Sequence, residues 1–247
     1  MTLPPHDTQS RLHHEPEARV VRVATPEVCC DDAWEKAYER FESPQQEVAK
    51  FVRRLKRLGQ RGWPRDAAIV ELFCGRGNGI VALERLGFHN VEGVDLSERL
   101  LRCYRGSARC YVADCRALPF DDASKDVLIV QGGLHHLPNL EIDLRNVFRE
   151  AHRVLREAGR IVVVEPWTTP FLTIVEWLCG MPMVRRLSRR ADALATMIEL
   201  EHPVYHRWLE QGEAILDQFD QHFEREYLRI AWGKLFYVGR KPTTPRG

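Results

Sequence analysis

The fold of this chain is decided by residues 69–79, which read IVELFCGRGNG. The β-branched residues and Glu71 predict a buried strand, and the alternating glycines predict a tight turn after it. The apolar stretch 80–86 predicts a helix, and residues 90–95 (NVEGVD) predict the next strand. Such a strand–turn–helix–strand unit points the free N–H groups of the helix at whatever lies over the turn.

Asp95 ends the second predicted strand, about 20 residues after the turn, where βαβ units place an acid that binds ribose hydroxyls. The dinucleotide fingerprint Gly-x-Gly-x-x-Gly is not met. Its third glycine would stand at Ile80, whereas Gly79 comes one residue early. This spacing disfavours a pyrophosphate site and, with it, a nicotinamide-dependent oxidoreductase.

A further acid, Asp114, ends a third predicted strand, and the sequence CRALPF follows it. Acids after three strands around a Gly-x-Gly turn resemble the class I S-adenosylmethionine-dependent methyltransferases. The resemblance extends roughly over residues 63–167 and includes the segment His-His-Leu at 135–137. It implies an α/β fold, a Rossmann-like doubly wound sheet that is mostly parallel, with an antiparallel C-terminal edge. The break in strand–helix alternation after residue 166 adds a predicted helical insertion.

The resemblance also implies an S-adenosylmethionine site at the carboxyl ends of the strands. Glu71 would bind the methionine amino group, Asp95 both ribose hydroxyls, and Asp114 the adenine amino group. The full set of cofactor-binding residues that it implies is Glu71, Cys74, Gly75, Gly77, Asp95, Asp114, Cys115 and Gln131. Two positions depart from the usual D-x-G-x-G-x-G pattern: Glu71 stands in place of the aspartate, and Phe73 stands in place of the first glycine. We expect the Phe73 side chain to point away from the cofactor.

His135 and His136 follow the fourth predicted strand, residues 126–130, where this family's residues face the transferred methyl group. A neutral imidazole near pH 7 can take the proton of a weak nucleophile such as a hydroxyl. We therefore predict that one of these histidines is catalytic; the alternative is that they hold the loop by hydrogen bonds. Glu165, after the fifth predicted strand, is a further candidate.

Residues 1–30 are rich in proline, histidine and charge, which predicts a disordered or loosely packed segment that is not a signal peptide. Residues 31–247 are expected to form the methyltransferase domain, with a helical insertion at 166–222. Within the insertion, residues 171–178 are apolar but too short to span a bilayer. They predict a buried helix or an acceptor-pocket wall that includes Trp167, Phe171 and Trp177.

The composition is ordinary for a globular protein, with 44% hydrophobic and 29% charged residues and a net charge of +1. A balance of 36 basic and 35 acidic residues offers no bulk footprint for nucleic acid, although residues 184–190 are a basic run. The seven cysteines favour reduced thiols in a cytosolic, cytoplasmic protein. No cysteine–histidine spacing indicates a metal site.

The predicted function is methyl transfer from S-adenosylmethionine to a small-molecule acceptor, at an oxygen nucleophile. A tRNA-modifying methyltransferase is the main alternative, because the His-His-Leu segment also resembles enzymes that methylate wobble uridines. A catalytically silent binding module is another alternative, which Phe73 favours and Asp95 and Asp114 oppose.

Overall fold

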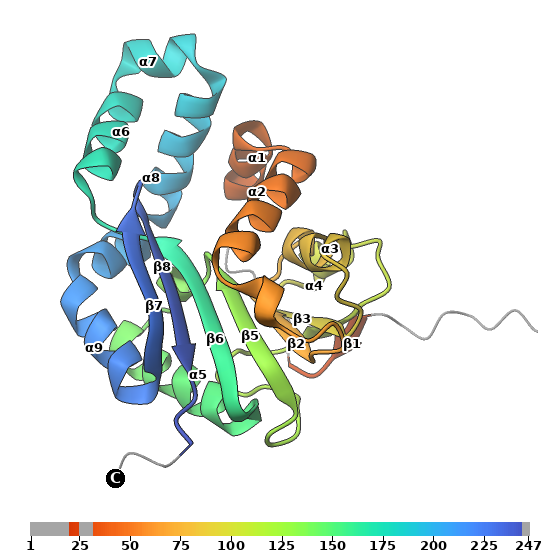
Figure 1. Ribbon diagram of the computed structural model, residues 1–247. Coiled ribbons are helices and arrows are strands. Elements are labelled where there is room, and N and C mark those ends of the chain that lie inside the picture. Colours follow the sequence, from red (N-terminus) through yellow and green to blue (C-terminus); the bar gives the residue numbers. More distant parts are fainter. Residues whose placement is uncertain (1–19, 25–31, 244–247) are drawn as a thin grey trace, which may run out of the picture.

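The computed structural model describes residues 20–24 and 32–243, in which eight strands form one sheet (Figure 1). The order across the sheet is β1-β4-β3-β2-β5-β6-β8-β7. The strands are β1 (Val20–Arg22), β2 (Ile69–Leu72), β3 (Val91–Asp95), β4 (Arg109–Val112), β5 (Lys125–Gln131), β6 (Leu155–Pro166), β7 (Glu224–Ala231) and β8 (Lys234–Arg240).

Strand β8 runs antiparallel to both of its neighbours, β6 and β7, and it makes the antiparallel C-terminal edge together with β7. The remaining pairs are parallel, with Leu72 of β2 opposite Val94 of β3 on one side and Val130 of β5 on the other. The predicted Rossmann-like, mostly parallel sheet is therefore confirmed. Its strand order reverses between β2 and β5, which is the point where doubly wound sheets bind ligands.

Helices cover both faces of this sheet, as the wholly buried β2 and the continuous apolar run within β5 require (Figure 1). One face packs against α5 (Leu140–Val154) and α9 (Gly212–His222) through Phe148 and Phe219. The other face packs against α2 (Pro44–Arg57) and α3 (Asn78–Arg85) through Phe51 and Ile80. The helices of this part of the chain are α1 (Asp32–Phe41), α2 (Pro44–Arg57), α3 (Asn78–Arg85), α4 (Glu98–Leu101) and α5 (Leu140–Val154), with short 3₁₀ helices η1 (Gln60–Gly62) and η2 (Leu134–His136).

The segment 1–30, predicted to be disordered or loosely packed, contains a strand at its described residues. Val20–Arg22 pairs in parallel with Cys110–Val112 of β4 and forms the outer edge of the sheet. Residues 1–19 and 25–30 lie outside the described part of the chain. Strand β1 has only three residues, too few for hydrophobic periodicity to reveal a strand. It is a strand because β4 supplies its hydrogen-bond partners.

The helical insertion lies between β6 and β7 and consists of α6 (Pro170–Gly180), α7 (Pro182–Leu187), α8 (Arg189–Glu210) and α9 (Gly212–His222). Three of these helices, α6, α7 and the adjacent part of α8, project beyond the sheet (Figure 1). None of the helices in the described ranges is both long enough and apolar enough to cross a bilayer. The prediction of a buried helix at 171–178 is wrong, because Ile174 and Trp177 of α6 are exposed.

The predicted acceptor-pocket wall of Trp167, Phe171 and Trp177 is also not formed. Trp167 is buried and packs edge-on against Trp208 of α8, with ring centroids 6.1 Å apart. Phe171 and Trp177 lie on the outer surface of α6 instead. A short helix in which most residues are apolar carries little signal for which side chains face inward, so the packing of α6 in the structure decided this.

Candidate active site

Glu71 and Gln131 lie side by side at the switch point of the sheet, at the ends of β2 and β5. Nε2 of Gln131 donates a hydrogen bond of 3.3 Å to Oε1 of Glu71. The other oxygens, Oε2 of Glu71 and Oε1 of Gln131, are buried and have no hydrogen-bond partner among the described residues. Burial raises the pKa of Glu71 to about 8. Two unsatisfied acceptors at this edge are suited to a ligand that brings donors, such as an ammonium group.

The turn after β2 fits around Glu71 through two unusual residues. A Cβ atom on Gly79 would come within 1.8 Å of Oε1 of Glu71, so the longer acid is accommodated only because residue 79 is glycine. Phe73 has a left-handed backbone conformation with φ of 55°, which residues other than glycine rarely adopt. Its ring lies against Gly133, where a Cβ would be 2.2 Å away, and so it supports the loop that carries the histidines.

Asp95 holds the turn to the end of β3. Its Oδ2 accepts the N–H of Gly75 and its Oδ1 accepts the N–H of Ser97, both at 2.8 Å. Burial raises the pKa of Asp95, and these two backbone donors oppose the rise. A carboxylate has about four acceptor positions, so Asp95 retains two for ribose hydroxyls.

Asp114 is half-buried after β4 and is held by Arg116. Its pKa is lowered: partial burial would raise it, but the hydrogen bonds from Arg116 outweigh that effect. Nη2 of Arg116 lies 2.6 Å from Oδ2 of Asp114, and Nη1 lies 2.8 Å from Asp143 of α5. The neighbouring Cys115 is buried, and burial raises the pKa of its thiol. No feature of the sequence indicated that Arg116 is the partner of Asp114.

Cys74 and Gly77 complete the predicted turn residues. The Cys74 thiol is buried toward Gly93, whose added Cβ would be 2.7 Å from the sulfur, and a hydrogen bond with Cys110 raises its pKa. Gly77 has φ of 74° and precedes α3. The side chain of Cys74 therefore belongs to the core, and only its backbone faces the turn.

Glu47 of α2 is a further buried acid near this turn. Its Oε2 accepts a hydrogen bond of 2.7 Å from Nδ2 of Asn78, the first residue of α3, and its Oε1 accepts one from the hydroxyl of Tyr38. The charge of Glu47 contributes to the raised pKa of Glu71. Helix α2 therefore lies over the turn. No local signal in the sequence distinguishes Glu47 from a solvated acid.

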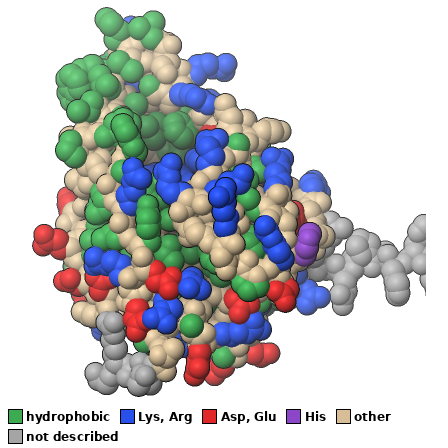
Figure 2. All heavy atoms as spheres, in the orientation of Figure 1, with side chains coloured by type: hydrophobic (Ala, Val, Ile, Leu, Met, Phe, Trp, Pro, Cys, Tyr) green, Lys and Arg blue, Asp and Glu red, His purple; other side chains and the backbone are tan. Residues whose placement is uncertain are grey.

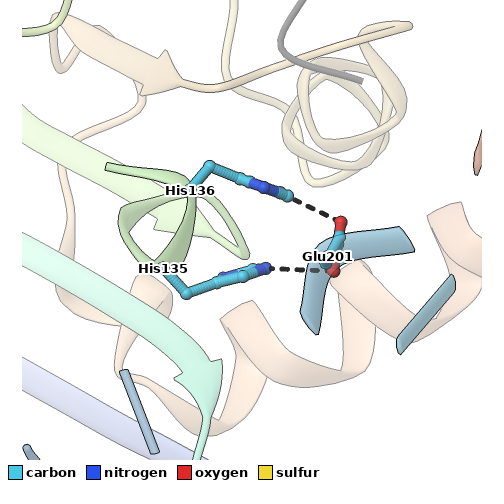
Figure 3. A group of neighbouring side chains, drawn as sticks. All are labelled: His135, His136 and Glu201. Carbon is cyan, nitrogen blue, oxygen red and sulfur yellow. Dashed lines mark ion pairs between the residues drawn. The ribbon is translucent and has the colours of Figure 1, made fainter. Parts of the chain in front are cut away.

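His135 and His136 lie in η2, directly after β5, and both face Glu201 of α8 (Figure 3). Nε2 of His135 is 3.8 Å and Nε2 of His136 is 3.6 Å from a carboxylate oxygen of Glu201. Behind them, Oε2 of Glu165 lies 2.7 Å from Nδ1 of His135, and Oε1 accepts the N–H groups of Gly133 and Leu134 at 2.8 Å. Glu165, a secondary candidate from the sequence, thus organises the whole loop.

The two histidines have opposite protonation. Burial alone would lower the pKa of His135, but the charges of Glu165 and Glu201 outweigh it and raise the pKa to about 9. Burial and the neighbouring charge of His135 lower the pKa of His136 to about 4. His135 is therefore a cation paired with Glu165 at neutral pH, while His136 is uncharged and can accept a proton.

Glu201 was not anticipated from the sequence, because it lies 65 residues beyond His136 in the helical insertion. One of its oxygens is buried without a hydrogen-bond partner in the described chain, so the cluster has room for a donor. The ligand atoms of His135, His136 and Glu201 lie within 4.8 Å of one another, a set that can surround a divalent metal.

Residues 70–163 match the family described as methyltransferase domain. Together with the sheet order and the acids at the strand ends, this match decides the family. These residues form a class I S-adenosylmethionine-dependent methyltransferase domain. The chain is an enzyme of this class, and S-adenosylmethionine is its cofactor.

The methyltransferase is 24% identical over 204 residues to 27-O-demethylrifamycin SV methyltransferase of Amycolatopsis mediterranei. The aligned region covers 71% of this chain and 73% of that relative. It is 31% identical to demethylmenaquinone methyltransferase of Clavibacter sepedonicus over 61% of this chain and 60% of that one. In fold it is similar to the PH0226 protein of Pyrococcus horikoshii, with a TM-score of 0.63 and 18% identity over 86% of this chain and 100% of that one.

The residues of the methyltransferase fit this cofactor. The unpartnered oxygens of Glu71 and Gln131 lie where the sheet's switch point places a ligand, and Asp95 keeps free acceptor positions one strand away. A methionine ammonium would satisfy Glu71 and Gln131, and it would stabilise the ionised form of Glu71. When bound, the cofactor supplies a methyl group already activated by its sulfonium.

Proposed function

We propose that the enzyme methylates a small-molecule acceptor at an oxygen nucleophile, with His136 as the general base. The observation that carries this proposal is the position of His136, which lies in the loop at the carboxyl edge of the sheet with its Nε2 atom 3.6 Å from a carboxylate oxygen of Glu201. An acceptor hydroxyl loses its proton as the oxygen attacks the methyl group. A ring nitrogen of His136 takes that proton, and Glu201, 3.6 Å away, stabilises the imidazolium that forms.

The remaining residues align the reaction and exclude water. Glu165 holds η2 through two backbone N–H groups and His135, so the position of His136 is set by a buried anchor. Phe73 packs behind the same loop at Gly133. Alignment of this kind is the main requirement for methyl transfer, because the methyl group is already activated.

A small acceptor is supported by the relatives, whose names specify a demethylrifamycin and a demethylmenaquinone. It is also supported by the charges of the basic run at 184–190. Arg185 is paired with Asp192 at 3.0 Å and with Glu199, and Arg190 donates to Gln46. Two of the four arginines are thus held by the protein's own residues rather than available to phosphates.

The test is a panel of acceptors with S-adenosylmethionine carrying a labelled methyl group. Phenols, alcohols and quinols form one arm, carbon acids the second, and bulk tRNA the third. We expect label in an O-methyl product from the first arm. Transfer to carbon with none to oxygen would refute the oxygen acceptor, and transfer to tRNA alone would refute the small molecule.

A further inference from the structure

The helical insertion carries an apolar outer surface that the rest of the chain does not cover. On α6 and α7 the exposed fractions are 56% for Ile174, 64% for Trp177, 73% for Met183 and 83% for Leu187. Figure 2 shows hydrophobic side chains gathered on the part of the molecule that corresponds to these helices. Scattered exposed apolar residues are ordinary, but a concentration of large ones on a projecting element marks an interaction site.

The turn between β7 and β8 extends the same surface. Trp232 in this turn is 70% exposed, and its ring packs edge-on against Phe171 of α6 with centroids 5.2 Å apart. Leu172 lies against Gly233, where an added Cβ would be 3.2 Å away. Two segments about 60 residues apart therefore contribute to one apolar surface, which we call the apolar tip: Phe171, Ile174, Trp177, Leu178, Met183, Leu187 and Trp232.

Folding of the insertion does not explain the apolar tip. The inner faces of α6, α7 and α8 pack on a small core of their own, made of Cys179, Ala191 and Ala195 with Val175 and Val184 against them. Hydrophobic residues that this core does not use remain on the outside. A monomer in water gains nothing from them, so the apolar tip is suited to a partner.

Positive charge borders the apolar tip. Residues 167–190 contain four arginines and one glutamate, a net charge of +3. Arg186 and Arg189 are exposed and make no ion pair with any described residue, and the single acid, Glu176, accepts a hydrogen bond from Tyr205 at 2.8 Å. Helices that lie in the interface of an anionic bilayer typically combine tryptophan and leucine with arginine.

We propose that the apolar tip and its bordering arginines dock the enzyme on the surface of an anionic lipid bilayer. The apolar side chains enter the headgroup region, and Arg186 and Arg189 contact lipid phosphates. The tip lies on the membrane rather than across it, because α6 has 11 residues and a span needs about 20. A second copy of the chain is a poorer partner, since a symmetric contact would bring like-charged arginines together.

Docking would also orient the active site. Helix α8 runs from the apolar tip to Glu201, beside His135 and His136 (Figures 1 and 3). An acceptor dissolved in the lipid would then meet the enzyme on the side that carries the catalytic histidine. This consequence rests on the proposed function, whereas docking itself does not.

The experiment is flotation of the purified full chain with vesicles of phosphatidylcholine, with and without phosphatidylglycerol. We expect the chain to float with the anionic vesicles, and added salt to weaken binding. The double variant Trp177→Glu, Leu187→Glu should bind roughly tenfold or more weakly. The matched control is Ile142→Glu, which places the same charge at a 53% exposed position on α5 and should float like wild type.

The variant Arg186→Glu, Arg189→Glu should lose the preference for anionic vesicles. The midpoint of thermal unfolding and the kcat for a water-soluble acceptor should be the same in all these variants as in wild type. These two measurements separate a failure of docking from a failure of the proposed function. Absence of wild-type flotation, or equal flotation of wild type and the Trp177, Leu187 double variant, would refute the proposal. A dimer in sedimentation that the same double variant abolishes, without vesicle binding, would assign the surface to self-association and likewise refute it.

Discussion

The Nδ1 atom of His135 lies 2.7 Å from Oε2 of Glu165, and both side chains are buried. This ion pair joins the loop after β5 to the end of β6. Burial lowers the pKa of His136, and the positive charge that this pair keeps on His135 lowers it further. The pair therefore helps to keep His136 uncharged and able to act as a base.

We predict that Glu165→Ala destabilises the protein by about 3–5 kcal/mol, because it leaves His135 without its partner and frees two backbone N–H groups. Glu165→Gln should cost less, since the amide oxygen can still accept those N–H groups. The measurement is the free energy of unfolding in urea. Equal losses for the two variants would show that the charge of Glu165 accounts for the whole effect and that its hydrogen bonds to the two backbone N–H groups contribute nothing.

The stability of the same pair should depend on pH in a defined direction. The pKa of His135 is raised in the folded state to about 9, above its ordinary value of 6.5. The stabilisation is therefore fully present below about pH 6.5 and is lost as the pH rises toward 9. Urea midpoints measured across this range should fall for wild type, and His135→Gln should remove this part of the decline.

His136→Asn should lower kcat by roughly 10²–10⁴ with little change in cofactor affinity, because it removes the general base and leaves the cofactor residues intact. Since the pKa of His136 is about 4, wild-type kcat should fall only as the pH approaches that value. The measurements are kcat as a function of pH and calorimetry with S-adenosylhomocysteine. A variant that retains most of its turnover would leave His136 with a structural role only.

Cofactor affinity should rise with pH because of Glu71. Its pKa of about 8 means that the free enzyme holds Glu71 protonated at neutral pH, while a methionine ammonium favours the carboxylate. Binding should therefore release a proton. Affinity should increase between about pH 5.5 and 7.5, below the region where the α-amino group itself titrates.

Calorimetry in buffers of different ionisation enthalpy measures that proton release. Glu71→Gln is the control, because it cannot ionise and keeps nearly the same shape. It should bind more weakly and without proton release. An unchanged pH dependence in this variant would mean that another group provides the linkage.

Gly79→Ala should weaken cofactor binding roughly tenfold and destabilise the protein by about 1–3 kcal/mol, since its Cβ would overlap the carboxylate of Glu71. Gly180→Ala is the matched control, because nothing lies within 4 Å of the Cβ position there. Unfolding curves and calorimetry on both variants measure the two effects. A Gly79 variant indistinguishable from the Gly180 variant would show that Glu71 does not need that space.

The sequence by itself was sufficient for the class of fold and for the order of its central elements. A strand, a glycine turn and a helix at residues 69–86 are set by local conformational preferences and by hydrophobic periodicity, both of which are readable along the chain. The sequence also singled out Asp95, Asp114, His135 and His136 as site candidates for one reason: each lies at or shortly after the end of a predicted strand, and strand ends meet at one edge of a parallel sheet.

Only the tertiary structure decided the partners of those residues. Glu201 reaches the histidines from an insertion, Arg116 connects Asp114 to Asp143, and Glu47 lies near the turn from a separate helix. The structure likewise placed α6 on the outside, against the expectation that it is buried. The physical reason is that such contacts depend on how helices pack in three dimensions. A residue's own sequence neighbourhood does not determine which distant side chain lies against it, nor what that neighbour does to its pKa.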